Sequence, residues 1–290
     1  MSQGGKSERM NFLRRKIAGI EAGGLDPEGI EADAAQVSLG ENCSLDRPLQ
    51  GGLRRGALHE IAPARADDAA AASGFALALS ARFAAQAAPP QSNIVWIIED
   101  FAGVENGAPY GPGLALSGVD PARLLFVHTL NAKDSLWTME EALKCRAAAA
   151  VIAEIWSLEK AYGLAASRRL VLAAQKSGTP GLMLAAGMAR RADLFSSSAQ
   201  TRFEILTRPS LHAPSARGMP LPGPACWSVR IVKARAGPDG FGFDRERFFA
   251  VHWDHEKACF RDAFPLSLPS LSRNRPDHSA DARARRSQTA

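Results

Sequence analysis

Two carboxylates stand at the ends of apolar runs, which is where an open parallel sheet holds its ligand. Glu99 closes the run at 94–99, and Glu154 lies near the end of the run at 149–155. Both runs have the continuous apolar character of buried parallel strands, whose carboxyl ends border the ligand crevice. Carboxylates at such positions serve phosphoryl transfer as an activating base and a magnesium ligand. They also occur simply as solvated strand ends, and the residues alone leave both interpretations open.

A phosphate cradle would have to lie in the turn after the strand predicted at 57–61. The motif would be GxxxxGK[ST], but residues 62–69 read APARADDA, so Asp67 and Asp68 replace the last glycine and the lysine. A helix N-terminus attracts an anion by about 0.3–1 kcal/mol, whereas a carboxylate about 4 Å from a phosphate repels it by roughly 4 kcal/mol at an effective dielectric near 20. We therefore expect no nucleotide cofactor, and we expect Asp67 to cap the helix that follows. Arg65 is an alternative phosphate cation, although it would lack a backbone nest.

The other reactive groups do not combine into sites. Residues 4–7 read GGKS, but no strand precedes them. In the segment HWDHE, strand alternation puts His252 and Asp254 on one face and His255 on the other, so we expect no metal. No CxxC pair is present, and the cysteines are interpreted as reduced thiols: Cys43, Cys145, Cys226 and Cys259.

Apolar and amphipathic segments alternate along the chain and would position the carboxylates. Strand signals followed by helix signals are typical of right-handed βαβ units and a parallel sheet covered on both faces. The predicted strands are 57–61, 94–99, 124–128, 149–155 and 181–185, and the predicted helices are 67–88, 134–146 and 158–175.

The pattern changes after residue 200. A lone strand is predicted at 201–207, and a proline-rich loop follows it. Segments 227–235 and 247–253 flank a Gly/Pro/Asp turn, which predicts an antiparallel hairpin. The fold class is therefore α/β, a mostly parallel sheet flanked by helices with a C-terminal antiparallel hairpin.

Length and charge narrow the function classes. The chain has 290 residues, of which 46% are hydrophobic, and this is enough for a sizeable core. No apolar run approaches the ~20 residues of a membrane span, so we expect no membrane contact and a cytoplasmic location. The net charge is +5, but residues 1–20 carry +4 and residues 270–290 carry +3, which leaves about −2 for the body. Because the positive charge lies in the termini, any DNA contact should be weak or indirect.

The two ends are candidate partner-binding segments. Residues 7–22 predict an amphipathic helix that either packs on its own domain or docks on another protein. The C-terminal segment is Ser/Pro/Arg-rich and predicted to be disordered, either a solvated end or an arm for a partner. The helix presents Met10, Leu13, Ile17 and Ile20 on one face, and the tail carries Arg273, Arg275, Arg283, Arg285 and Arg286. The predicted organisation is a helix at 1–22, a linker at 23–55, a core at 56–264 and a disordered tail at 265–290.

Three segments together point to a known family: GVDPARLLFV at 118–127, SAQTRF at 198–203, and the hairpin from WSVRIVKAR at 227–235 to VHWDHE at 251–256. They resemble the ImuA family, the RecA-like accessory proteins of the bacterial inducible-mutagenesis cassette. The resemblance covers about residues 8–256 and implies a RecA-like core with the N-terminal helix and the disordered tail outside it. On this alignment the turn after Ile61 is a degenerate P-loop, Glu99 matches the catalytic glutamate, and Glu154 matches the magnesium-binding aspartate.

The resemblance implies a non-catalytic adaptor in SOS-induced, error-prone translesion DNA synthesis. Its implied partners are an ImuB-like protein and an error-prone C-family DNA polymerase, with RecA as a further candidate. Two alternatives stay open: a RecA-like ATPase with an unusual phosphate site, and a cell-division inhibitor resembling SulA. The intact run of strands before residue 150 argues against the second alternative.

Overall fold

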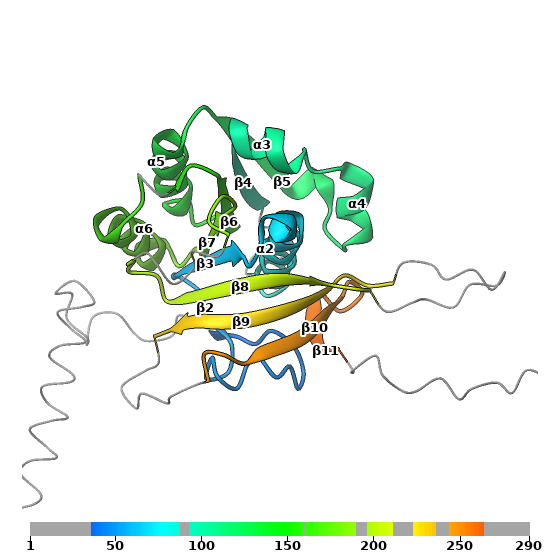
Figure 1. The fold of residues 1–290 in the computed structure, drawn as a ribbon. Helices are drawn as coiled ribbons and strands as arrows, with labels where there is room; N and C mark the ends of the chain where they lie inside the picture. Colours follow the sequence, from blue (N-terminus) through cyan, green and yellow to red (C-terminus); the bar gives the residue numbers. More distant parts are fainter. Residues whose placement is uncertain are drawn as a thin grey trace, which may run out of the picture.

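A nine-stranded sheet organises the computed structural model, which describes residues 36–87, 93–158, 161–189, 196–210, 223–235 and 244–263 (Figure 1). The strand order is β11-β10-β9-β8-β3-β7-β6-β4-β5. The six strands from β8 to β5 run parallel, and β9, β10 and β11 are each antiparallel to the preceding neighbour. The strands are β3 (Leu58–Pro63), β4 (Asn93–Glu99), β5 (Leu124–Thr129), β6 (Ala148–Ile155), β7 (Gly181–Ala185), β8 (Thr201–Arg208), β9 (Cys226–Ala234), β10 (Phe248–Asp254) and β11 (Cys259–Asp262).

This architecture confirms the predicted fold class, with two differences at the C-terminal side. The predicted hairpin is the β9–β10 pair. The strand predicted to stand alone is β8, which pairs in parallel with β3 and antiparallel with β9, so it joins the two parts of the sheet. Strand β11 was not predicted, because its four residues are too short for a periodic signal.

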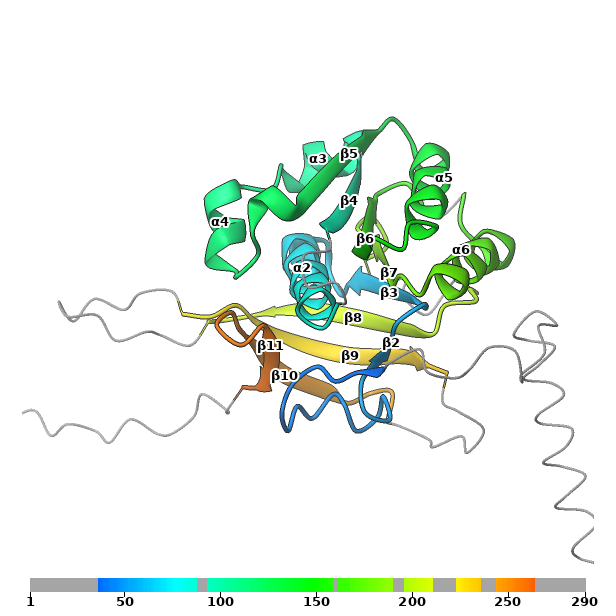
Figure 2. The ribbon, with the colours of Figure 1, turned by 180° about the vertical axis from the view of Figure 1, so that it is seen from behind.

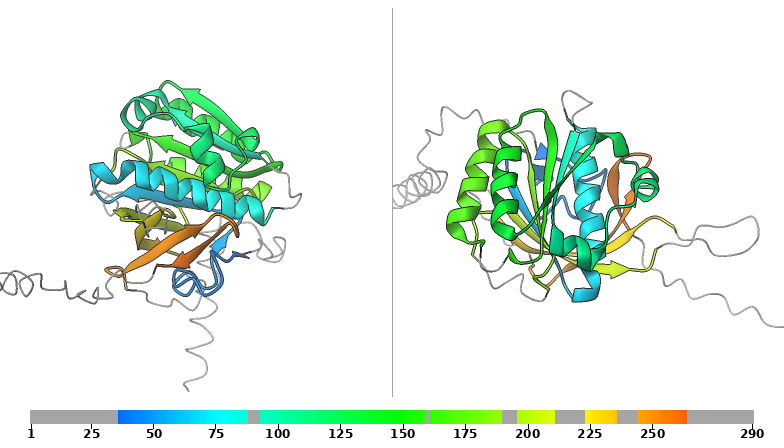
Figure 3. Two further views of the ribbon diagram at one scale, coloured as in Figure 1. Left: turned by 90° about the vertical axis from the view of Figure 1, so that its right-hand side faces the viewer. Right: turned by 90° about the horizontal axis from the view of Figure 1, so that it is seen from above.

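Helices cover both faces of the sheet (Figure 3). On one face lies α2, a largely buried helix whose many alanines permit close approach to the strands. On the other face lie α5 and α6, side by side. The helices are α2 (Ala69–Ala85), α3 (Asp100–Asn106), α4 (Gly111–Leu116), α5 (Ala132–Leu143) and α6 (Leu164–Ser177), with 3-10 turns η1 (Ala66–Asp68) and η2 (Pro121–Arg123).

Aromatic residues fill the core between α2 and the C-terminal strands. The Phe75 ring of α2 lies 5.8 Å from Phe203 of β8, 5.7 Å from Trp227 of β9 and 5.2 Å from Phe260 of β11, measured between ring centroids. The Trp227 indole also donates to the Ala71 carbonyl oxygen at 2.9 Å. These contacts attach the antiparallel strands to the same core as the parallel ones, and so the chain from β3 to β11 folds as one unit.

The predicted linker at 23–55 is wrong for residues 36–55, which belong to the core. Strands β1 (Gln36–Val37) and β2 (Leu53–Arg54) pair with each other, and the segment lies beside β10 and β11 (Figure 2). Leu39 and Leu45 are buried, and the Phe260 amide donates to the Leu39 carbonyl oxygen at 2.8 Å. The segment shows no helical or strand period because turns hold it together, with Asp46 accepting from the Leu39 amide at 2.9 Å. The N-terminal helix predicted at 7–22 and the tail at 265–290 lie outside the described residues.

Candidate functional site

The turn after β3 holds Asp68 in an internal contact. The Asp68 side chain is buried, and its carboxylate accepts from the Thr207 amide of β8 at 2.8 Å and from Arg65 Nε at 3.1 Å. Burial opposes the charge of Asp68, but the Thr207 and Arg65 contacts outweigh it and lower its pKa below the ordinary value. Asp68 therefore ties the turn to the strand beside it, and Arg65 has a carboxylate partner already.

Asp67 does not have the predicted role. It is exposed and lies inside η1, a 3-10 turn that starts at Ala66 and continues into α2. Asp68 occupies the N-cap position of α2, and neither η1 nor α2 has a side-chain cap hydrogen bond. The N-cap prediction for Asp67 is therefore wrong, because the added 3-10 turn moves the start of the helix by two residues.

Glu99 organises the loop that follows β6. Its side chain is buried and accepts from the Trp156 amide at 2.7 Å, from the Ser157 amide at 3.0 Å and from the Ser157 hydroxyl. Three donors from one turn satisfy the carboxylate and fix the chain after the strand. In this arrangement Glu99 acts as an anchor for the 156–157 turn.

Glu154 lies in a different environment, among donors from three elements. One oxygen accepts from Ser73 of α2 at 3.0 Å and from Asn106 of α3 at 2.8 Å, and the other accepts from the Trp96 indole of β4 at 3.2 Å. Burial raises the pKa of Glu154, and the three hydrogen bonds oppose that rise. Glu154 thus joins α2, α3 and β4 behind the carboxyl ends of the strands.

The structure does not bring the two glutamates together. On β4, Glu99 lies on the same face as Val95 and Ile97, which point toward α5 and α6. On β6, Glu154 lies on the same face as Ile152, which points toward α2. Because alternate residues of a strand point to opposite faces, the two carboxylates lie on opposite sides of the sheet. The predicted grouping of Asp67, Asp68, Glu99 and Glu154 into one degenerate pocket is therefore wrong.

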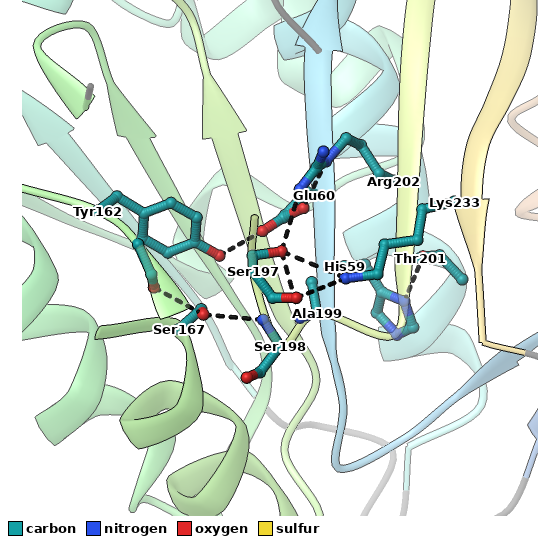
Figure 4. A network of polar contacts seen from close by, with 11 residues as sticks. His59, Glu60, Tyr162, Ser167, Ser197, Ser198, Ala199, Thr201, Arg202 and Lys233 are labelled. Atoms are coloured by element: carbon teal, nitrogen blue, oxygen red, sulfur yellow. Dashed lines mark hydrogen bonds and ion pairs between the residues drawn. The ribbon is translucent and has the colours of Figure 1, made fainter. Parts of the chain in front are cut away.

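A buried polar network that the sequence analysis missed lies between β3 and β8 (Figure 4). Glu60 and Arg202 face each other in the parallel register, with 2.7 Å between Arg202 Nε and Glu60 Oε2 and at most 5% of either side chain exposed. The Tyr162 hydroxyl donates to the other Glu60 oxygen. Burial, followed by the Glu60 charge, raises the pKa of Tyr162 well above its ordinary value.

The network continues into the segment before β8. Arg202 Nη2 donates to the Ser197 hydroxyl at 3.0 Å, and Lys233 of β9 donates to the Ser197 carbonyl oxygen at 2.7 Å (Figure 4). Desolvation lowers the pKa of Lys233 to about 8. Every strong donor here has an acceptor on a neighbouring element, so the network fixes the 197–202 segment, which contains all but the last residue of the family-like SAQTRF run. The sequence signal was a single glutamate, Glu60, inside the otherwise uncharged strand β3.

His59 completes the polar pairing on the other face of β3. Its Nδ1 lies 2.8 Å from the Thr201 hydroxyl, and its Nε2 lies 3.0 Å from the Arg54 carbonyl oxygen. The ring is fully buried, and desolvation lowers its pKa to about 4. A neutral His59 therefore links β2, β3 and β8.

Apolar side chains are exposed on α3 and on and just after the edge strand β5. Four residues, which we name the β5–α3 patch, are between 51% and 79% exposed: Phe101, Val104, Leu125 and Leu130. Strand β5 ends the sheet order, so one of its edges has no strand partner among the described residues. It carries no lysine or proline, the usual protection of a free edge.

The remaining sequence predictions concern a metal site, a membrane span and the partner-binding residues. No group of three or more His, Cys, Asp or Glu side chains that could hold a metal occurs among the described residues. In the same part of the chain, no helix has both the length and the apolar character of a membrane span. The partner-binding candidates Met10, Leu13, Ile17, Ile20 and the five tail arginines lie outside the described residues.

Comparison with known proteins places the chain among its relatives. No family model matches it. It is 31% identical over 201 residues to Protein ImuA from two strains of Caulobacter vibrioides, NA1000 / CB15N and ATCC 19089 / CIP 103742 / CB 15, covering 66% of this chain and 75% of each relative. Among solved structures it is similar to the RadB recombinase, with a TM-score of 0.47, 14% identity, and coverage of 79% of this chain and 100% of that one. The extent and identity of the first match show that the chain belongs to the ImuA family.

Proposed function

We propose that this protein is a non-catalytic adaptor in SOS-induced, error-prone translesion DNA synthesis, working in the cytoplasm. Its partners would be an ImuB-like protein and an error-prone C-family polymerase, with RecA as a further candidate. Membership of the ImuA family supports a mutagenesis role. The observation that carries the non-catalytic part is the use of Asp68, Glu99 and Glu154 in internal hydrogen bonds.

The phosphate chemistry of the turn after β3 supports the same proposal. A triphosphate would have to displace the Arg65 contact and approach the Asp68 carboxylate, which repels phosphate. Glu99 and Glu154 lie on opposite faces of the sheet, so they cannot share one nucleotide. An ATPase that used Arg65 as its phosphate cation would need these contacts to rearrange.

The β5–α3 patch supports a role in assembly. An exposed apolar edge strand is a template for pairing with another chain, and exposed apolar clusters mark interaction surfaces. The two termini would add contacts, the N-terminal helix through its apolar face and the tail through arginines that suit carboxylates. DNA contact would remain weak or indirect.

The test is co-purification of the full chain with each candidate partner. Wild type should capture the ImuB-like protein and the polymerase, whereas Val104→Asp with Leu125→Asp should capture less because two charges replace apolar contacts. The matched control is Phe248→Asp, at a residue 47% exposed on β10, remote from the patch. Failure of wild type to capture either partner contradicts the proposal.

The termini need variants of their own. Leu13→Asp with Ile17→Asp, and deletion after Leu271, should each reduce capture and damage-induced mutagenesis while the core keeps its thermal unfolding midpoint. Full capture and full mutagenesis by both variants would show that the ends are solvated or locally packed segments.

A further inference from the structure

A groove runs between α5 and α6 on the outer surface of the protein. Figure 3 shows the two helices side by side on one face of the sheet. Two concavities of about 430 and 500 Å³ lie along them, and both are lined by Glu140 and Arg169. These two side chains form an ion pair across the groove. The concavities are thus two halves of one groove, divided by that ion pair.

Exposed apolar side chains line both halves. Trp137 of α5 is 61% exposed in one half, and Leu172 of α6 is 38% exposed in the other. The apolar lining of the first half is completed by Leu136, Ala161, Ala166 and Leu170. Exposed tryptophan and leucine side chains in one groove are typical of a binding surface, because aromatic and aliphatic anchors contribute most of the contact energy there.

The rim of the groove is cationic. Lys133, Arg146 and Lys176 have no ion-pair partner within the described residues, whereas Lys144 and Arg169 pair with glutamates of α5. Cations at the ends of α5 and α6 would partly be explained by the helix dipoles. The helix dipole does not explain Lys133, because this residue lies in the first turn of α5, where the dipole disfavours a cation. The rim therefore has a charge pattern that helix stability does not account for.

We propose that this groove binds an acidic amphipathic helix of a partner protein. Lys133 and Lys144 are eleven residues apart, which corresponds to ~16 Å along α5 and to about three turns of a bound helix. Leucine-type side chains of the bound helix would enter the two halves beside Trp137 and Leu172. Its acidic residues would pair with Lys133, Arg146 and Lys176.

Single-stranded nucleic acid fits the groove less well. Binding of a single strand uses successive aromatic platforms for bases and a continuous cationic track for phosphates. This groove offers one exposed aromatic and an aliphatic lining in place of successive aromatic platforms. The observations therefore favour a peptide. The inference does not depend on the proposed function, since the groove shares no residue with the β5–α3 patch.

The probe is a fluorescein-labelled helical peptide of about 14 residues, with leucines at i, i+3, i+4 and i+7 and glutamates on the opposite face. In fluorescence anisotropy with the full chain, we expect saturable binding that weakens as salt is added. A second peptide with lysine in place of each glutamate should bind at least about tenfold more weakly.

Groove variants decide whether the peptide binds where proposed. Trp137→Ala, and Arg146→Glu with Lys176→Glu, should each weaken binding at least about tenfold. The control Lys257→Glu, an exposed lysine after β10, should not change it. Thermal unfolding checks that each variant remains folded.

Three results would overturn the proposal: no saturable binding of the acidic peptide, equal binding of the lysine peptide, or binding that ignores the groove variants. A labelled oligo-dT strand that displaces the peptide and is itself weakened by the groove variants would assign the groove to nucleic acid instead. Because the probe is synthetic, failure here leaves the co-purification test of the proposed function unaffected.

Discussion

Removing Arg202 should cost more stability than removing any exposed arginine. In Arg202→Met the Glu60 carboxylate, only 1% exposed, keeps the Tyr162 hydrogen bond but loses its ion-pair partner at 2.7 Å, and the Ser197 hydroxyl loses a donor at 3.0 Å. Breaking a buried ion pair from one side costs about 3–5 kcal/mol, because the remaining charge stays buried without compensation. That is a large fraction of the roughly 5–15 kcal/mol by which a domain is stable.

The matched control is Arg261→Met. Arg261 pairs with Asp254 at 2.8 Å, a similar distance, but the arginine side chain is 43% exposed. Solvated pairs contribute about 0–1 kcal/mol. The double variant Glu60→Gln with Arg202→Met should regain part of the lost stability, because it removes the uncompensated charge.

Urea unfolding followed by circular dichroism measures these differences. We expect a large downward shift of the midpoint for Arg202→Met, a small one for Arg261→Met, and an intermediate one for the double variant. Equal shifts for the two single variants would refute the assignment of the network as a structural anchor, as would a double variant no more stable than Arg202→Met.

Three further predictions follow from individual contacts. The pKa of His59 is about 4 in the folded protein and about 6.5 in the unfolded chain, so the unfolded state takes up the proton first as the pH falls. The free energy of unfolding should therefore drop by about 3 kcal/mol between those pH values, and the urea midpoint of His59→Gln should depend less on pH. Gly40→Ala would place a Cβ 2.0 Å from the Phe260 carbonyl oxygen and should destabilise the protein by roughly 1–3 kcal/mol. The control Gly163→Ala adds a Cβ with no neighbour within 4 Å and should lower the thermal midpoint less; equal midpoints would contradict the packing of residues 36–55 on β11. Asp68→Ala leaves the Thr207 amide without its acceptor and should cost about 1–3 kcal/mol, with Asp68→Asn costing less. An unchanged urea midpoint would contradict the anchoring role.

Most of the parallel strands were predictable because they are short apolar runs, and β3, β6 and β7 are buried along their whole length. Strand β7 was predicted with its observed bounds, and β4 and β6 with a difference of one residue at the N-terminal end. The pairing of β8 with β3 was not predictable in this way. It depends on contacts between residues about 140 apart, such as Glu60 with Arg202, that no local pattern contains.

The candidate site shows the limit of placing residues by motif position. Glu99 ends β4 and Glu154 lies one residue before the end of β6, as the sequence indicated, and the structure pairs these two strands in parallel. Their side chains point to opposite faces of the sheet, because side chains alternate between the two faces along each strand. The position of a residue within an apolar run does not reveal to which face it points. The core segment at 36–55 escaped prediction for a related reason: turns and side-chain hydrogen bonds hold it, and these leave no period in the sequence.

The most direct test of the adaptor proposal measures the affinity of the full chain for an ImuB-like protein from the same organism, with and without millimolar Mg-ATP. If Asp68, Glu99 and Glu154 serve only as internal anchors, the two proteins should bind with the same dissociation constant in both conditions, and no phosphate should be released. Binding that requires Mg-ATP, or that releases phosphate as it forms, would contradict the proposal and assign the chain to the ATPases.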